Sequence, residues 1–270
     1  MGHMMATGPI KVAFLLADYG HDPTETAIPW KVFKKYGWEV DIVTEQAEVP
    51  KCDKLMLSGW TQKLLGAPAP AIDAYDALTH SSEWQHPMSW MREDFSLTDF
   101  DVVFLPGGHD KGVRQILDSA RVHQLLAEYF PLTKKPSKKC CAAICHGVQV
   151  LANSTGLSGK SVLQYVTTTA LPGLMESAAY QSTRLFLGDY YKTYGAGTAN
   201  VEDFVKKSLN DPSKQWRSSA NPALPFVVED EGHNYLSGRW PGDAQLLAEK
   251  VVRLVHGIHH IQHKAEHRPA

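Results

Sequence analysis

Short apolar runs alternate with segments of helical spacing through the first half of this chain. The predicted elements are strands at residues 10–17, 38–45 and 100–108, a strand that ends at Cys145, and helices at residues 24–37 and 121–130. Strands that alternate with helices in this way favour a mostly parallel, doubly wound α/β sheet with helices on both faces. In such a sheet, binding and catalytic sites form beyond the carboxyl ends of the strands.

The segment KKCCAAICHG, residues 138–147, places Cys145 where a buried strand turns sharply into a helix. Gly147 supplies the small residue that such a turn tolerates. Unpaired amides at the start of the helix stabilise an anion, so the thiol is expected to be more acidic than a free thiol. This is the geometry of a nucleophile elbow, with cysteine in place of serine. The alternative is a structural cysteine at the end of a core strand, as we expect for Cys140 and Cys141.

Composition excludes several classes of function. The 270-residue chain is 43% hydrophobic and 21% charged, which is typical of a globular protein. Its net charge of −2 gives no electrostatic reason to bind nucleic acid or an anionic membrane, and no apolar run approaches the roughly 18 residues of a membrane span. Three of its four cysteines cluster between residues 140 and 145, which favours a reducing, cytoplasmic setting over a disulfide framework.

We expect a single domain at residues 10–256. Residues 1–9 include MGHM, which is typical of an expression-tag remnant, and are expected to be disordered. Residues 257–270 form a His-rich tail in which histidines four residues apart could bind a metal. A solvated helix end explains that spacing better, so no metal site is predicted.

Residues 46–99 interrupt the alternation of strands and helices. They contain two histidines and three tryptophans: His80, His86, Trp60, Trp84 and Trp90. The segment is too long for an ordinary connection. We interpret it either as a cap inserted over the carboxyl edge of the sheet, with Trp90 as a substrate-binding side chain, or as a surface excursion with its own aromatic cluster.

The end of the chain has clearer signals than the stretch before it. Residues 184–222 show no readable pattern, whereas residues 224–238 predict a hairpin with a turn around Glu231, Gly232 and His233. A last helix is expected to begin near Pro241.

Several motifs, taken in order, resemble one family. They are ETAIP from Glu25 to Pro29, WEVDIVTE, DVVFLPGGHD, AICHG and YLSGRWPGDAQLL. In this order and spacing they are similar to the ThiJ/PfpI superfamily, which has the class I glutamine amidotransferase-like fold. The resemblance spans most of residues 10–256 and implies a flavodoxin-like three-layer sandwich that usually dimerises, so a homodimer is expected.

The resemblance implies roles for three residues. Cys145 is the nucleophile, Glu25 is the acid that hydrogen-bonds the sulfur and shuttles a proton, and His146 is a base beside the thiol. The family often holds this histidine with a further acid. Glu176 is one candidate for that role, but its match is poor and the role stays unassigned. Without the resemblance, Glu25 and His146 would be ordinary polar residues of a first helical turn.

The turn at the end of the third predicted strand supplies further candidate residues. Gly107 and Gly108 would let backbone amides approach a substrate oxygen and, with the amide of His146, form an oxyanion hole. An ordinary strand-to-helix turn would also contain glycine. His109 either lines the pocket or begins the next loop.

The resemblance is nearest to the glyoxalase III-like branch, which implies a cofactor-independent cysteine enzyme that converts a small 2-oxoaldehyde to a 2-hydroxy acid. One alternative is a hydratase, hydrolase or lyase of a bulkier metabolite, such as an isocyanide. Another is a stress chaperone that senses redox state through oxidation of Cys145. A glutamine amidotransferase is disfavoured, because those enzymes have glycine beside the cysteine and a late His-x-Glu pair that is missing here.

Overall fold

A seven-stranded sheet forms the centre of the molecule. The computed structural model describes residues 8–219 and 221–266, with side chains except at positions 64, 65 and 260–266. The strands, in spatial order, are β3 (Met88–Ser89), β2 (Glu39–Thr44), β1 (Lys11–Leu15), β4 (Val102–Leu105), β5 (Cys140–Ile144), β7 (Tyr235–Gly238) and β6 (Val227–Glu229). Neighbouring strands are parallel except β6, which runs antiparallel to β7. The predicted doubly wound α/β fold is confirmed.

Strands β4 and β5 are buried on both faces, which explains why their sequences are continuous apolar runs. Successive side chains point to opposite faces. Val103 and Cys141 belong to the core on one face, and Phe104 and Cys140 belong to the core on the other. The expectation that Cys140 and Cys141 are core residues is therefore confirmed, and all four cysteines are free thiols.

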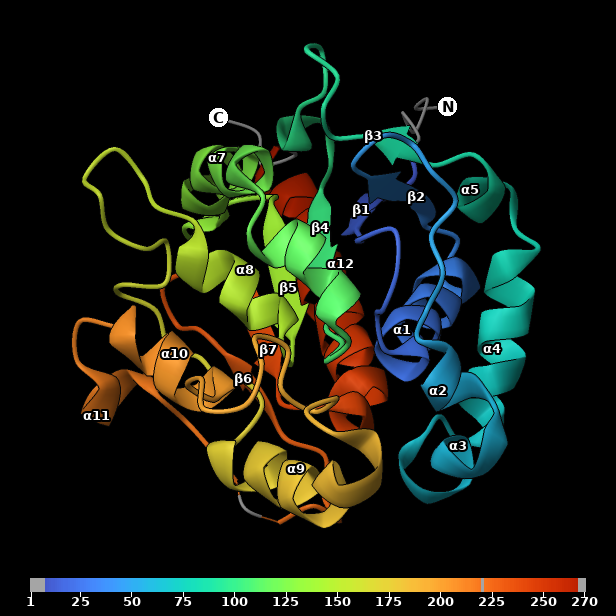
Figure 1. Cartoon of the computed structure of the whole chain (residues 1–270). Coiled ribbons are helices and arrows are strands. Elements are labelled where there is room, and N and C mark those ends of the chain that lie inside the picture. The colour runs from blue at the N-terminus through green and yellow to red at the C-terminus, as the bar shows by residue number, and fades with distance from the viewer. Residues whose placement is uncertain (1–7, 220, 267–270) are drawn as a thin grey trace.

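Helices cover both faces of the sheet (Figure 1). One face is covered by α1 (Pro23–Lys35) and α12 (Ala244–Glu266), with α4 (Ala69–Thr79) packed against α1. The other face is covered by α6 (Arg114–Leu117), α7 (Ala120–Tyr129), α8 (Gly147–Asn153) and α10 (Val201–Lys207). α9 (Gly173–Leu187) lies beside α10, and α11 (Pro212–Gln215) follows. Short 3-10 turns lie at Leu97–Asp99, Lys111–Val113, Phe130–Thr133 and Pro241–Asp243.

Segment 46–99 runs along the side of the molecule next to α1 (Figure 1). It forms α2 (Lys54–Leu57), α3 (Gly59–Leu65), α4, α5 (Ser82–Gln85) and the edge strand β3. Trp84 is buried and meets the ring of Tyr75 edge-on, which gives the segment an aromatic cluster of its own. Within the segment, α4 packs against α1 and β3 extends the sheet.

The predicted hairpin at residues 224–238 is present as the β6–β7 pair. Asp230 closes its turn by accepting hydrogen bonds from the amides of Gly232 and His233. The last helix, α12, continues to Glu266, past the predicted domain end at residue 256. Most of the predicted tag remnant and the last four residues of the His-rich tail lie outside the described residues. Within the described part of the chain, no helix is both long and apolar enough to cross a membrane.

Gly147 leaves no room for a side chain where β5 turns into α8. A Cβ there would lie 2.1 Å from the carbonyl oxygen of Leu105 and 3.0 Å from that of Pro106, both of which are backbone atoms. We expect Gly147→Ala to lower the free energy of unfolding by about 1–3 kcal/mol or more, as overpacking does. Urea unfolding at 25 °C measures the change.

The matched control is Gly257→Ala within α12, where nothing lies within 4 Å of an added Cβ. That change should raise the free energy of unfolding by about 0.5–1 kcal/mol, because alanine favours a helix interior over glycine. Equal stability of Gly147→Ala and the wild type would contradict the close approach at the elbow.

Candidate active site

Cys145 lies in the sharp turn between β5 and α8 that the sequence predicts. Its φ is +57°, a left-handed conformation that costs a residue with a side chain about 1–3 kcal/mol. The Cys145 amide donates to the carbonyl oxygen of Gly238 on the neighbouring strand, 3.1 Å away, which holds the turn against the sheet. The side chain lines a cavity at the carboxyl end of the strands.

Glu25 is brought to the thiol by the first turn of α1. Asp22 caps this helix, and its side chain accepts hydrogen bonds from the amides of Thr24 and Glu25. The Glu25 carboxyl is fully buried, and its Oε2 accepts a hydrogen bond of 2.9 Å from the Gly107 amide. The carboxyl lies near the Cys145 thiol, and each group shifts the pKa of the other. Among the described residues, the second oxygen, Oε1, has no partner.

Burial controls the ionisation of this pair. It raises the pKa of Glu25 well above the usual value, and the nearby Asp22 carboxyl raises it further. Burial also raises the pKa of Cys145, and so does the charge of Glu25, whereas the His146 amide lowers it. The expectation of an unusually acidic thiol is therefore wrong, because one helix amide does not offset the loss of water and an adjacent carboxylate.

His146 lies beside the thiol and is held in one tautomer. Its Nδ1 is 3.4 Å from Cys145 Sγ, and its Nε2 is 3.0 Å from Thr193 Oγ1. The Thr193 hydroxyl donates its proton to the carbonyl oxygen of His109, 2.9 Å away, so it accepts the proton carried by Nε2. Nδ1 is then unprotonated and faces the thiol. Burial lowers the pKa of His146 to about 3, so the ring is neutral near pH 7.

Thr193 thus occupies the position where the family often has an acid. Glu176, the acid considered from the sequence, does not contact His146 through a hydrogen bond. Its Oε1 accepts from Lys192 Nζ at 2.7 Å, and its Oε2 accepts from the Val201 amide at 2.8 Å. Thr193 falls in the stretch that showed no readable pattern, so sequence reasoning missed it.

Replacing Thr193 with valine is expected to slow the alkylation of Cys145 by iodoacetamide at pH 7 by about tenfold, because the orientation of the base is lost. Thr193→Ser keeps the hydroxyl and should keep the rate. Because packing changes could also slow alkylation, the ¹⁵N shifts of the His146 ring supply a second readout. Nδ1 should be the unprotonated nitrogen in the wild type and in Thr193→Ser, and a mixture of tautomers should appear in Thr193→Val. A wild-type ring spectrum for Thr193→Val would contradict the assignment.

Gly107 and Gly108 have different roles. A side chain at Gly107 would lie 2.6 Å from Glu25 Oε2 and 2.8 Å from Cys145 Cβ, so the glycine permits this close approach. Because its amide is donated to Glu25, Gly107 cannot supply the predicted oxyanion donor. Gly108 lines the cavity, and its amide has no hydrogen-bond partner among the described residues. The amides of Gly108 and His146 remain as donors toward a substrate oxygen.

His21 holds the Gly107 turn against the loop after β1. Its Nδ1 donates to the carbonyl oxygen of Gly107 at 2.9 Å, and its Nε2 accepts from the Ala17 amide at 2.8 Å. The Asp22 amide donates to the same Gly107 carbonyl at 3.0 Å. Burial lowers the pKa of His21 to about 4, so the neutral ring keeps both bonds. Sequence reasoning did not single out His21.

His109 lines the cavity, as one of its two predicted roles requires. Its ring lies 4.5 Å from that of Tyr190 and 4.4 Å from that of Tyr191. Tyr190 in turn donates a hydrogen bond to Asp53. Burial lowers the pKa of His109 to about 3, and its Nε2 has no hydrogen-bond partner within the described part of the chain. The two tyrosines also come from the unreadable stretch.

The cavity that contains Cys145 has a volume of about 620 Å³. Its polar lining residues include Asp22, Glu25, His109, Cys145, His146 and Glu176. Its apolar lining residues include Met56, Leu171, Leu174, Met175, Ala179 and Trp240. Of the described residues in segment 46–99, only Met56 lines it, so α9 and its flanks form more of the wall than the predicted cap.

Trp90 does not reach this cavity. It is fully buried in the core on the face of the sheet that α7 and α8 cover. Its amide donates to the carbonyl oxygen of Thr44. Trp90 follows β3, and the strand order places β3 four positions from β5, or about 19 Å at the usual strand spacing. The prediction that Trp90 binds substrate is therefore wrong.

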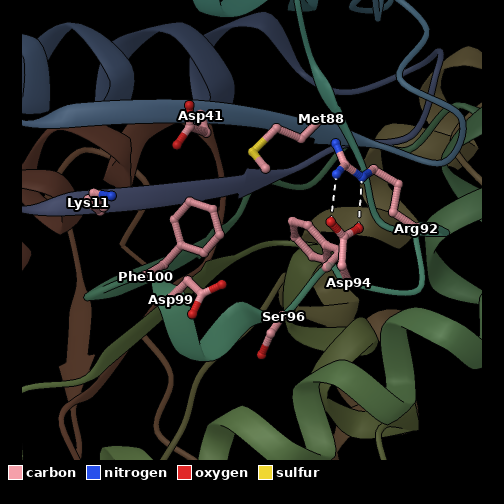
Figure 2. A pocket seen from close by; sticks show the side chains of 9 residues that line it. Lys11, Asp41, Met88, Arg92, Asp94, Ser96, Asp99 and Phe100 are labelled. Atoms are coloured by element: carbon pink, nitrogen blue, oxygen red, sulfur yellow. Dashed lines mark hydrogen bonds and ion pairs between the residues drawn. The ribbon is translucent and has the colours of Figure 1, made fainter.

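A second, smaller hollow of about 220 Å³ lies near the amino end of β1 (Figure 2). Lys11, the first residue of β1, lines it, whereas Cys145 lies beyond the carboxyl end of β5. Figure 2 shows its Arg92 guanidinium paired with Asp94, at 2.9 and 2.7 Å. Within the described residues, no group of three or more His, Cys, Asp or Glu side chains could hold a metal ion at either place.

The parallel sheet and the buried Cys145, Glu25 and His146 define a doubly wound α/β protein with a cysteine at a nucleophile elbow. The chain belongs to the ThiJ/PfpI-like family, whose model matches residues 16–220. The resemblance found in the motifs is therefore confirmed.

Similarity to other proteins extends over nearly the whole chain. Two uncharacterized proteins of Schizosaccharomyces pombe are 29% and 24% identical to it over 254 residues; the first match covers 91% of this chain and 84% of that protein, the second 89% and 76%. Among solved structures, glyoxalase III from Candida albicans has a TM-score of 0.63 at 16% identity, covering 91% of this chain and 97% of that chain. The rapid encystment protein of Francisella tularensis has a TM-score of 0.60 at 16% identity, covering 91% and 99%. At these identities the solved structures share the fold.

Proposed function

We propose that this protein is a cysteine-dependent enzyme that converts a 2-oxoaldehyde and water into a 2-hydroxy acid without an added cofactor. The observation that carries the proposal is the placement of the Cys145 thiol between a neutral histidine, 3.4 Å away, and a buried carboxyl group. A nucleophile with two proton carriers suits a reaction that moves protons between neighbouring carbons. The shared fold with a glyoxalase III is consistent with it.

In the first step, Cys145 Sγ adds to the aldehyde carbon. His146 Nδ1 takes the thiol proton as the carbon–sulfur bond forms, and the aldehyde oxygen gains the electron pair of its double bond. The amides of Gly108 and His146 stabilise that oxygen. Protonation of the oxygen then completes a hemithioacetal.

In the second step, a proton moves from the aldehyde carbon to the neighbouring ketone carbon. Glu25 is suited to carry this proton, because it lines the cavity and its Oε1 has no hydrogen-bond partner among the described residues. The hydroxyl proton of the hemithioacetal passes to the ketone oxygen. The first carbon is thereby oxidised to a thioester, and the second carbon is reduced to an alcohol. Water then hydrolyses the thioester, which releases the 2-hydroxy acid and returns the proton to Cys145.

The test is an assay of purified protein with methylglyoxal and phenylglyoxal, in which loss of the dicarbonyl and formation of the hydroxy acid are followed together. Incorporation of solvent deuterium at the alcohol carbon would report exchange of the migrating proton with solvent. Formation of the hydroxy acid from either compound supports the proposal. Hydration of an isocyanide without any conversion of an oxoaldehyde would replace it with the hydratase alternative.

A further inference from the structure

The cavity beside Cys145 is larger than a three-carbon oxoaldehyde requires. Its volume of about 620 Å³ lies within the range of about 300–1,000 Å³ for pockets that bury drug-sized ligands. A molecule of five non-hydrogen atoms, such as methylglyoxal, would leave most of this space to water. A substrate that fills the space gains the free energy of removing apolar surface from water.

Apolar side chains make up much of the cavity wall, and the polar Glu176 and Ser182 of α9 lie among them. Met175 and Ala179 line the cavity from α9, Leu171 precedes that helix, and Trp240 lies on the segment before α12. Met56 adds a flexible side chain from the opposite side. These side chains offer contact surface to an alkyl or aromatic group and few hydrogen bonds, so they favour an apolar substituent.

The charges around the cavity disfavour an anionic substrate. No Lys or Arg is among the described residues that line it, whereas Asp22, Glu25 and Glu176 are. The ammonium group of Lys192 is paired with Glu176 at 2.7 Å. Burial lowers the pKa of His146 to about 3, so it supplies no positive charge near neutral pH. A carboxylate or phosphate on the substrate would find no counter-ion here.

We propose that the substrate is an uncharged 2-oxoaldehyde with an aromatic or long alkyl substituent, which lies against Met175 and Ala179 while its aldehyde carbon meets Cys145. This inference rests on the proposed function. Glu25 Oε1 and His109 Nε2, which have no hydrogen-bond partners among the described residues, leave hydrogen-bonding capacity at the dicarbonyl end. The apolar end of the substrate needs no hydrogen-bonding groups.

Three substrates separate the contributions of size and charge: methylglyoxal, phenylglyoxal and para-carboxyphenylglyoxal. After correction for their reactivity toward a free thiol, kcat/KM for phenylglyoxal should exceed that for methylglyoxal by about 10- to 100-fold, from burial of the ring. The carboxylate should lower kcat/KM at least about tenfold relative to phenylglyoxal. Methylglyoxal turned over as efficiently as phenylglyoxal, or no penalty for the carboxylate, would overturn the inference.

Filling the apolar wall should remove the preference. Ala179→Phe places a ring in the cavity and should lower the ratio of kcat/KM for phenylglyoxal to that for methylglyoxal at least about tenfold. The matched control, Gln181→Phe, adds the same ring to an exposed position of α9 that does not line the cavity and should leave the ratio unchanged. An unchanged ratio in Ala179→Phe would contradict the assigned position of the substituent.

A second readout does not depend on turnover. Alkylation of Cys145 is compared for bromoacetone and 2-bromoacetophenone, with glutathione as the reference thiol and the modified peptide identified by mass. The preference of Cys145 for the aromatic reagent should exceed that of glutathione at least about tenfold and fall in Ala179→Phe. If no oxoaldehyde is converted but this preference is present, the proposed reaction fails and the apolar, uncharged ligand class stands. Without the preference, the ligand class fails as well.

Discussion

Cys145→Ala is expected to lower kcat for oxoaldehyde conversion by at least about 10³-fold, because the covalent route needs the sulfur. Cys145 lies in a strained turn, near the Glu25 carboxyl and 3.4 Å from the neutral ring of His146. Neither neighbouring group can form the hemithioacetal in its place. The measurement is hydroxy acid formation under single-turnover and steady-state conditions, with folding checked by the unfolding transition.

Cys141→Ala is the matched control, since Cys141 is a fully buried thiol on the same strand whose side chain belongs to the core. Its loss should affect stability and leave kcat within a few-fold of the wild type. A Cys145→Ala variant that turns over oxoaldehydes at the wild-type rate would remove the nucleophile assignment. Equal losses of kcat in the two variants would mean that the loss reflects damage to the core.

Most of the fold could be predicted from the sequence because its strands are short apolar runs separated by helices. β1, β2, β4 and β5 all fall within the predicted strand segments, and β6 and β7 form the predicted hairpin. β3 could not be predicted, because two residues are too few for a periodicity and their pairing depends on where β2 lies. The position of segment 46–99 also depends on tertiary packing, so the sequence could not decide between a cap and a surface excursion.

The site was predictable where its residues lie in local motifs. Cys145 follows from the strand-to-helix turn, Glu25 and His146 follow from the motifs that resemble the family, and the structure brings all three together. Thr193 reaches His146, and α9 reaches the cavity, through tertiary packing, and no local pattern marks either of them. The Gly107 amide and the thiol pKa were misjudged because both depend on the buried carboxyl of Glu25.

Glu25→Gln is expected to move two measurements in opposite directions. The variant removes the negative charge of Glu25, which raises the pKa of Cys145. The pKa of the thiol should therefore fall, and the rate of alkylation by iodoacetamide at pH 8 should rise about tenfold. Oxoaldehyde turnover should fall about 10²- to 10⁴-fold, because glutamine cannot carry a proton between carbons.

The pH dependence of the free energy of unfolding provides a third, independent measurement. Burial raises the pKa of Glu25 in the folded state, so the stability that its protonated form contributes is complete below the unfolded pKa and is lost as pH rises through the folded pKa. Glutamine has no such loss, so the free energy of unfolding of Glu25→Gln should exceed that of the wild type at pH 8 and converge with it at pH 4. Its amide oxygen can still accept from Gly107, so this difference does not require a change in the turn.

Glu93→Gln changes an exposed carboxylate and should move none of the three measurements. Slower alkylation in Glu25→Gln would mean that Glu25 activates the thiol by removing its proton, which would reverse the assignment of His146 as the base.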